Sequence, residues 1–287
     1  MRLAGWLTGL GALGILLGDV SAAGAPSGPG RTPVGSAGAA SGGPPASSSP
    51  CASGQWNDRG VCVRFPGMAE NDEGPELQAV ANQHRDKSGA WKHYDQIPRR
   101  PERPASYEAY RYPIPPGLPG GTYVISGYDL DRPDDLQRRG RRLKHVGHGG
   151  LDLPQTRGTP VQLVNLEHQT ADAEVLFVGD LFGHSVVTKH VVREGERDRD
   201  YLVLYGHLDH AAPGLTMGAH LPEGAPLGAV GDSGSPELVH LHLEVRRARE
   251  GVDLAKMLHD GGPGLLVADW VSVVCDPRNV LPLATLP

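Results

Sequence analysis

The sequence lacks any excess of basic residues, and beyond its N-terminal segment it lacks long apolar runs. Its 287 residues include 27 Lys and Arg against 33 Asp and Glu, a formal net charge of −6. A chain of this charge gives no electrostatic support for nucleic-acid binding. No later segment reaches the roughly 20 apolar residues of a membrane-spanning helix. We therefore expect no nucleic-acid partner and, once the N-terminal segment is removed, no stable membrane span.

The first 50 residues are almost free of charge. Arg2 precedes an apolar run from Leu3 to Gly18, and the small residues Ser21-Ala22-Ala23 follow. This order is typical of a secretory signal peptide, here residues 1–23, and an uncleaved membrane anchor is the alternative. Residues 24–50 are almost wholly Gly, Ala, Ser and Pro, a composition that favours a flexible linker. We expect an exported protein, periplasmic or secreted.

Cysteine is scarce, with three residues in the whole chain. Cys51 and Cys62 flank the polar segment CASGQWNDRGVC, and in an exported protein such a pair favours a small disulfide loop over a metal site. Cys275 is then left over. A bridge from Cys275 to either of the others stays open, but we favour the pair Cys51 and Cys62, with Cys275 free and buried.

Residues 51–120 are rich in Pro, Arg and Glu and contain no recognisable repeat or wall-binding module. We interpret them as an N-terminal extension that wraps the following domain, with one short helix expected over residues Gly74 to Arg85. The main domain is expected to cover residues 121–287. Within it, Asp253 to Asp260 is expected to form a short helix.

From Thr122 onward, short β-rich runs alternate with Gly, Asp and Pro turns. Short strands without long helices between them predict a mainly β fold built of antiparallel sheets. The charged stretch Arg193 to Asp200 is expected to be a solvated hairpin loop. The predicted strands are Thr122–Ser126, Pro160–Leu166, Ala173–Val178, His184–Val192, Tyr201–Tyr205, Pro226–Val230 and Val239–Arg246.

Two short motifs together suggest a metal site. His148-Gly149-Gly150-Leu151-Asp152 places a histidine and a carboxylate four residues apart, and His240-Leu241-His242 follows about ninety residues later. Two histidines and one carboxylate leave a fourth coordination position open, which is typical of catalytic zinc sites. Neither motif is specific alone. In Val239 to Val245, however, apolar residues alternate with His240, His242 and Glu244, which predicts a strand with one face in the core and the other facing a cleft.

Several motifs of this chain resemble those of the lysostaphin-type zinc endopeptidases of bacterial peptidoglycan, in the order in which that family has them. The resemblance covers roughly residues 121–246 and the tail. It departs from the family pattern at Val164 to Ala173, in the charged hairpin insert and after Arg246, which affects groove shape and specificity. The matching pieces are Ser126-Gly127-Tyr128, His148-Gly149-Gly150-Leu151-Asp152-Leu153, Gly158-Thr159-Pro160-Val161, Tyr205-Gly206-His207-Leu208, Gly228 to Gly234, and His240-Leu241-His242-Leu243-Glu244.

The resemblance implies a lysostaphin-like duplicated hybrid motif, in which antiparallel sheets form an open groove beside few short helices. It implies one zinc ion per chain, held by His148, Asp152 and His242, with His207 and His240 as the catalytic histidines. His240 lies two residues from a ligand on the same strand face, about 6 to 7 Å along the strand. His145 is a rival for the first ligand position, and Glu244 is a candidate to support a ligand.

The function implied is an exported zinc-dependent endopeptidase that hydrolyses cross-links or stem peptides of peptidoglycan through a metal-activated water. The chain has no H-E-x-x-H helix, so a histidine is expected to act as the general base. The alternative is a catalytically inactive cell-wall regulator on the same fold that activates another wall hydrolase. A zinc D-alanyl-D-alanine carboxypeptidase is disfavoured because its Asp lies farther from its first His. Expected partners are stem peptides, cross-links and other envelope proteins.

Overall fold

The computed structural model describes part of the chain, from residue 55 to residue 284 with gaps. The predicted signal peptide, the linker, Cys51 and His145 lie outside the described residues, and so does the side chain of Cys62. The domain boundaries and the disulfide pair therefore remain predictions. The described ranges are 55–58, 61–64, 74–85, 89–115, 124–133, 137–138, 141–142 and 146–284.

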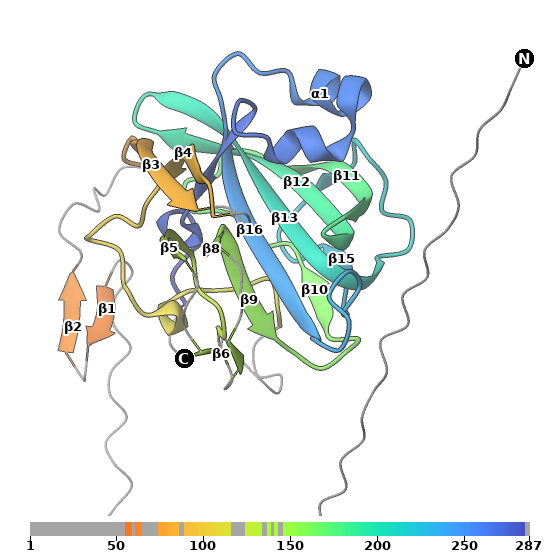
Figure 1. The fold of residues 1–287 in the computed structure, drawn as a ribbon, viewed down its shortest axis with the longest axis horizontal. Helices are drawn as coiled ribbons and strands as arrows, with labels where there is room; N and C mark the ends of the chain where they lie inside the picture. Colours follow the sequence, from red (N-terminus) through yellow and green to blue (C-terminus); the bar gives the residue numbers. More distant parts are fainter. Residues whose placement is uncertain are drawn as a thin grey trace, which may run out of the picture. The chain divides into compact units, whose positions relative to one another are not determined.

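One open mixed sheet dominates the described residues, and the predicted mainly β fold is confirmed (Figure 1). Its strands pair antiparallel except for β17 and β4, which run parallel. The strand order is β14-β11-β12-β13-β16-β17-β4-β3, with β9 beside β16 and with β15 joining β13 to β10. The bounds are β3 Val80–Arg85, β4 Trp91–Ile97, β9 Gly150–Pro154, β10 Pro160–Gln162, β11 Ala173–Leu181, β12 Gly183–Glu194, β13 Arg197–Ala211, β14 His220–Leu221, β15 Pro226–Val230, β16 His240–Ala248 and β17 Ser272–Cys275.

Three two-stranded ribbons and four short helices complete the described structure. The ribbons are β1 (Gln55–Asp58) with β2 (Val61–Arg64), β5 (Asp129–Pro133) with β8 (Val146–His148), and β6 (Gln137–Arg138) with β7 (Arg141–Arg142). The helices are η1 Tyr107–Ala109, α1 Leu254–Gly261, η2 Pro263–Val267 and η3 Pro277–Asn279. The expectation of few short helices is thus confirmed.

Strand β16 has the alternation that the sequence predicts. Leu241, Leu243 and Val245 are buried in the main core. His240 and His242 lie on the opposite face and are also largely buried. Strands β9 and β13 pair with the two edges of β16 and hydrogen-bond to its backbone. The side chains of β16 therefore project from the two faces of the sheet. The histidine face is therefore built into the middle of the sheet.

A second apolar cluster covers part of this sheet, where α1 and η2 pack onto it (Figure 1). Leu202 and Leu204 of β13 meet Leu254 of α1 and Leu266 of η2. The helix begins where the sequence predicts, because the Asp253 carboxylate accepts a hydrogen bond from the backbone N–H of Lys256 at 2.9 Å.

The N-terminal extension contributes to the sheet itself. The helix expected over Gly74 to Arg85 is wrong: Val80–Arg85 is strand β3, paired with β4. Helix propensity is a weak preference, and pairing with a neighbouring strand overrides it. Strand β4 then pairs with β17, and Ile97 and Tyr110 are buried in the main core.

The charged stretch Arg193 to Asp200 also differs from its prediction. The expected loop is a two-residue turn at Gly195 and Glu196, and the flanking residues continue β12 and β13, pairing Glu194 with Arg197. Charged side chains do not prevent a strand when the ladder of an adjacent long hairpin continues through them. Glu194 is itself buried, with Arg247 at 3.0 Å.

Cys275 is buried and free, as predicted. Burial raises the pKa of its thiol, so the reactive thiolate is disfavoured. The amide nitrogen of Asn279 lies 3.7 Å from its sulfur. The residue fills space between β17 and the extension rather than forming a bridge.

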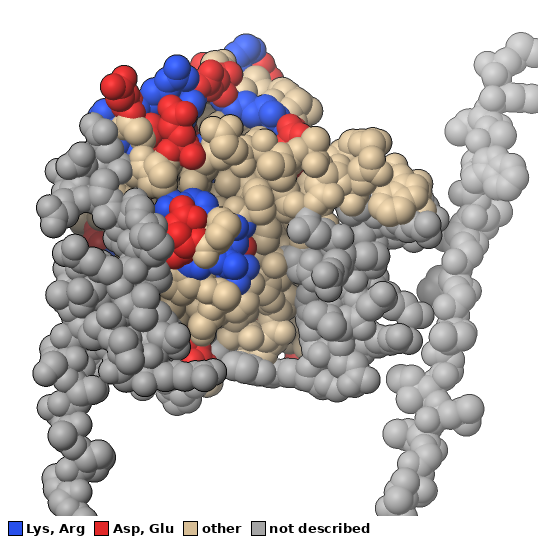
Figure 2. All heavy atoms as spheres, turned by 90° about the vertical axis from the view of Figure 1, so that its left-hand side faces the viewer, with Lys and Arg blue, Asp and Glu red and all other residues tan. Residues whose placement is uncertain are grey.

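The outer surface mixes charges of both signs. On the face shown in Figure 2, Lys and Arg side chains lie next to Asp and Glu side chains. Ion pairs of this kind include Arg100 with Glu102 at 2.6 Å and Arg249 with Asp95 at 2.6 Å. Among the described residues, no helix has the length and apolar character needed to cross a membrane.

Candidate metal centre

The site starts from the pairing of β9 with β16. Asp152 lies directly opposite His242 in this antiparallel ladder, so both side chains project from the same face of the sheet. His148 is the last residue of β8, and only Gly149 separates it from β9. Side chains from β8, β9 and β16 therefore converge on one point.

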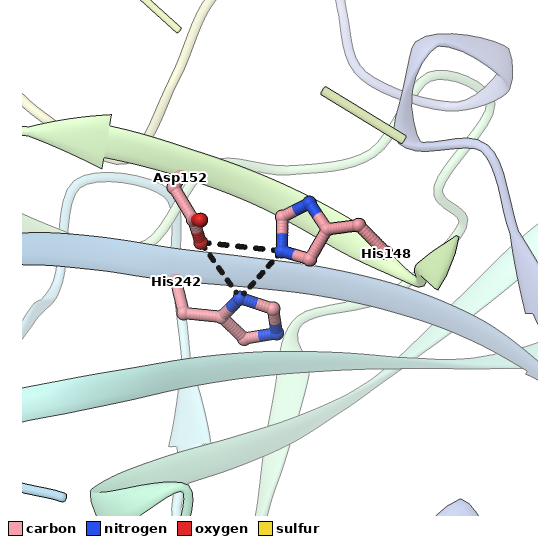
Figure 3. A group of neighbouring side chains, drawn as sticks. All are labelled: His148, Asp152 and His242. Atoms are coloured by element: carbon pink, nitrogen blue, oxygen red, sulfur yellow. Dashed lines mark hydrogen bonds and ion pairs between the residues drawn. The ribbon is translucent and has the colours of Figure 1, made fainter. Parts of the chain in front are cut away.

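The converging atoms have the spacing of metal ligands, and all three side chains point towards one another (Figure 3). Asp152 Oδ1 lies 3.0 Å from His242 Nδ1 and 3.3 Å from His148 Nε2. The two nitrogens are 3.3 Å apart. A tetrahedral ion with bonds of about 2.0 to 2.1 Å has ligand atoms about 3.3 to 3.4 Å apart, so the triangle fits three corners of such a site.

Hydrogen bonds on the outer nitrogens orient both rings. Nδ1 of His148 lies 2.8 Å from Ser126 Oγ and 2.9 Å from the Gly127 carbonyl oxygen. A carbonyl oxygen can only accept, so the contact with Gly127 favours a proton on Nδ1. Nε2 of His242 lies 3.4 Å from a Glu244 carboxylate oxygen. With the outer nitrogen protonated, the nitrogen that each ring directs at Asp152 is the one that can give up its proton and bind a metal ion.

The local charges also favour a cation. Burial raises the pKa of Asp152, but hydrogen bonds from His148 and His242 outweigh it and lower that pKa well below its usual value. Burial lowers the pKa of His242, but Asp152 and Glu244 outweigh it and raise it to about 9. Two carboxylates beside one buried imidazole attract positive charge, and this attraction acts on a metal ion as it does on a proton.

The glycines of the first motif have a steric role. A Cβ at Gly150 would lie 2.5 Å from the Leu243 carbonyl oxygen and 2.9 Å from Cε1 of His242. A Cβ at Gly149 would lie 3.3 Å from the Glu244 carboxylate. Glycine therefore lets β9 approach β16 closely enough for Asp152 to reach His242.

His240 lies beside the triangle on the same face of β16. Its Nδ1–H donates to the Leu238 carbonyl oxygen at 2.7 Å, which leaves Nε2 unprotonated in the neutral ring. Nε2 lies 3.5 Å from Asp152 Oδ1. The ring is thus next to the ligand atoms but outside the triangle, as its position two residues before His242 predicts.

His207 reaches the site through unusual backbone geometry. Its φ of 58° lies in the left-handed region, which is costly for a residue with a Cβ and typical of functional sites. Its Nδ1–H donates to the Ser233 carbonyl oxygen at 2.7 Å, and its ring centre lies 4.7 Å from that of His240. Burial lowers the pKa of His207 to about 4, and the neighbouring His240 and His242 add to the effect.

The structure brings all five predicted site residues together. Among the described residues, His148, Asp152 and His242 form the one group of three potential ligands whose atoms lie within 4.8 Å of one another. The other described histidines near the motifs lie elsewhere: His184 and His210 pair with exposed aspartates, and His190 is buried between Thr188 and Gln169.

Sequence reasoning missed two neighbours of the site. Phe182 packs edge-on against His242 with ring centres 5.4 Å apart, and nothing in its local sequence indicates this. Arg246 pairs with Glu244 at 2.7 Å. The alternation that placed Glu244 on the histidine face, extended by one step, would have found Arg246.

A comparison with known protein families finds a match in the same part of the chain. Residues 146–254 match the model of peptidase family M23, and all five site residues fall within that range. No curated protein matches the sequence. The family match supports a peptidase type of function.

Solved structures with a similar chain trace include three peptidases. A zinc containing peptidase from Vibrio cholerae is 22% identical, with a TM-score of 0.34, and the match covers 63% of this chain and 50% of that chain. The catalytic domain of lysostaphin from Staphylococcus simulans is 19% identical, with a TM-score of 0.30 and coverage of 46% and 84%. A putative peptidase M23 from Pseudomonas aeruginosa is 21% identical, with a TM-score of 0.26 and coverage of 64% and 71%.

The chain thus spans half the length of the Vibrio cholerae peptidase. Apart from Ser126-Gly127-Tyr128, the motifs quoted above lie within the residues that the family model matches. The predicted resemblance to lysostaphin-type peptidases is thus confirmed to this extent: residues 146–254 match the model of peptidase family M23.

Proposed function

We propose that this protein is an exported zinc-dependent endopeptidase that hydrolyses peptide cross-links or stems of bacterial peptidoglycan. The observation that carries the proposal is the triangle of His148 Nε2, Asp152 Oδ1 and His242 Nδ1, with edges of 3.0 to 3.3 Å, within the residues that match the model of peptidase family M23. Two nitrogens and one carboxylate oxygen suit zinc better than the all-oxygen sites of Mg²⁺ or Ca²⁺. We propose one zinc ion per chain.

Zinc bound at this triangle supplies Lewis-acid chemistry that polarises the scissile carbonyl. The chain's own contribution is proton transfer and orientation. His240 and His207 each donate Nδ1–H to a backbone carbonyl, so the Nε2 of each neutral ring is free to accept a proton. We propose that His240 takes the proton of the attacking water.

His207 has the same neutral tautomer, and its low pKa keeps it neutral near pH 7. A neutral ring in this form accepts a hydrogen bond at Nε2 and cannot donate one there. We therefore propose that His207 orients the attacking water as an acceptor. It becomes a donor to a developing oxyanion only after it has itself received a proton.

The proposed substrate is a stem peptide of the diaminopimelate type. The predicted signal peptide and linker support export, and the sequence contains no recognisable module for a particular cell wall. We therefore propose cleavage of ordinary cross-links, such as D-alanyl to diaminopimelate bonds, ahead of pentaglycine bridges.

The test is incubation of the purified zinc-loaded protein with isolated diaminopimelate-type sacculi, followed by mass spectrometry of the new amino ends. His242→Ala is the control that keeps the fold class but removes a ligand. Release of stem fragments by the wild type alone supports the proposal. Release of fragments from pentaglycine peptides but not from sacculi contradicts the substrate. If no substrate is cut while another wall hydrolase becomes more active, the protein is the non-enzymatic regulator instead.

A further inference from the structure

The histidine face of β16 continues beyond the ligands into a buried ion pair. Glu244 and Arg246 are each only 6% exposed. One carboxylate oxygen of Glu244 accepts from Arg246 at 2.7 Å, and the other lies 3.4 Å from Nε2 of His242. A buried ion pair is costly to form and rarely improves stability over apolar residues of similar size. Its position next to a ligand indicates another role.

Arg246 is itself held by several acceptors. Its Nε donates to Ser272 Oγ at 2.6 Å, and one terminal nitrogen donates to the carbonyl oxygens of Val267 and Ser272 at 2.9 and 3.1 Å. Ser272 Oγ in turn donates to the Leu266 carbonyl oxygen at 2.5 Å. Residues 266–272 lie outside the family match at 146–254, so a segment beyond that match anchors the ion pair.

Glu244 is also confined from the other side. Gly149 lies so close that a Cβ there would meet the Glu244 carboxylate at 3.3 Å. The carboxylate therefore sits between the backbone of the His148 motif, the His242 ring and the Arg246 guanidinium. With one oxygen bound by Arg246, the carboxylate directs the other at the outer nitrogen of His242.

We propose that Glu244, held by Arg246 and by residues 266–272, is a positioning residue for the metal ligand His242. Its carboxylate accepts the Nε2–H of His242, which fixes the tautomer, aims Nδ1 at the metal position and increases the basicity of the ring. This inference rests on the proposed zinc site. It adds a chain of contacts that runs from the metal position to the C-terminal part of the domain.

The test compares zinc affinity in two matched variants. Glu244→Gln removes the charge next to His242 and keeps the shape. Glu194→Gln makes the same change in a second buried carboxylate that pairs with an arginine, Arg247, but touches no proposed ligand. Zinc dissociation constants are measured by competition with a chelator, and Co²⁺ absorption spectra report the ligand geometry.

We expect Glu244→Gln to weaken zinc binding about 10- to 100-fold, the usual effect of removing such a partner, and to shift the Co²⁺ bands. Glu194→Gln is expected to leave both unchanged. Equal affinity in Glu244→Gln and the wild type overturns the proposal, and so does an equal loss in the two variants, which would point to a general effect of losing an ion pair.

A third variant covers the case in which Glu244→Gln does not fold. Glu244→Asp keeps the charge beside Arg246 but withdraws the carboxylate from the His242 ring by one methylene. We expect weaker zinc binding with an unchanged circular dichroism spectrum, and wild-type affinity would contradict the proposal. If the wild-type protein itself binds no zinc, the proposed function fails rather than the role of Glu244.

Discussion

At the scale of single residues, the four site histidines share one arrangement. Each ring has one nitrogen directed at a fixed oxygen acceptor, which leaves its second nitrogen unprotonated when the ring is neutral. Three acceptors are backbone carbonyls and one is a carboxylate. The pairs are His148 with Gly127, His207 with Ser233, His240 with Leu238, and His242 with Glu244. These acceptors thus favour, in each neutral ring, the tautomer that metal binding or proton transfer needs.

This arrangement predicts two classes of alanine variant. His148→Ala, Asp152→Ala and His242→Ala each remove a ligand atom, so we expect loss of bound zinc. His207→Ala and His240→Ala are expected to retain zinc and fold but to lose at least about 10²-fold in rate. Elemental analysis and a cleavage assay measure both properties. Full zinc in the first three variants, or a wild-type rate in either of the last two, would show that the residue concerned is misassigned.

A buried histidine away from the site predicts an acid effect on stability. His190 is fully buried, accepts from Thr188 and donates to Gln169, each at 2.7 Å, and burial lowers its pKa to about 3. The unfolded chain, with a His pKa of about 6.5, then binds more protons below pH 6.5. Stability is therefore complete above pH 6.5 and is lost as the pH falls from there towards 3.

The measurement is urea unfolding at pH 7 and pH 5, with His190→Gln as the comparison because its amide can bond to Thr188 but does not titrate. We expect the wild type to lose about 2 kcal/mol more unfolding free energy over this interval than the variant. Equal losses would mean that His190 accepts a proton in the folded protein without penalty.

At the scale of elements, the site depends on how closely β9 approaches β16. Gly150 is the contact point, since a Cβ there would lie 2.5 Å from the Leu243 backbone. Backbone atoms of a central strand cannot move aside as a flexible side chain can. The approach therefore couples the packing of two strands to the position of Asp152.

Gly150→Ala is therefore expected to lower the unfolding free energy by about 1 to 3 kcal/mol and to weaken zinc binding. Gly264→Ala is the matched control, because no atom lies within 4 Å of a Cβ at that position. Thermal unfolding and chelator competition test both variants. If the Gly150 variant matches the Gly264 variant in both measurements, the close approach is not what places Asp152.

At the scale of the whole molecule, the N-terminal extension forms part of the same sheet and core. Strand β4 pairs with β17, and Ile97, Tyr110 and Tyr112 are buried in the main core. Tyr107 also accepts a hydrogen bond from the backbone N–H of Tyr128 at 3.0 Å, beside the turn that holds His148. The extension therefore supports the domain that follows it.

We expect a fragment of residues 74–287 to unfold cooperatively and a fragment of residues 121–287 not to fold. Exposing a large apolar side chain by removing its partners lowers the unfolding free energy by about 1.5 to 3 kcal/mol. Several such losses exceed the marginal stability of a domain. Circular dichroism during urea unfolding measures the transition. Cooperative unfolding and zinc binding by the shorter fragment would contradict this expectation.

The sequence alone was sufficient for features set by local pattern. The alternation in Val239 to Val245 predicted a strand with histidines on one face, and Asp253 predicted the start of α1. The resemblance carried by these motifs indicated the five site residues, because chemistry demands particular side chains at particular spacings. The strand and the helix start depend on residues that are neighbours along the chain, and each motif is short and local.

Tertiary structure alone decided which distant groups meet. The change of Val80–Arg85 from the expected helix to a strand depends on pairing with β4. The burial of Glu244 and its contact with Arg246 depend on residues 266–272 folding back over β16. Strand partners and buried ion pairs are set by long-range packing, whose free energy exceeds local propensity. A local pattern therefore placed the ligands on one face, and only the fold showed what holds them there.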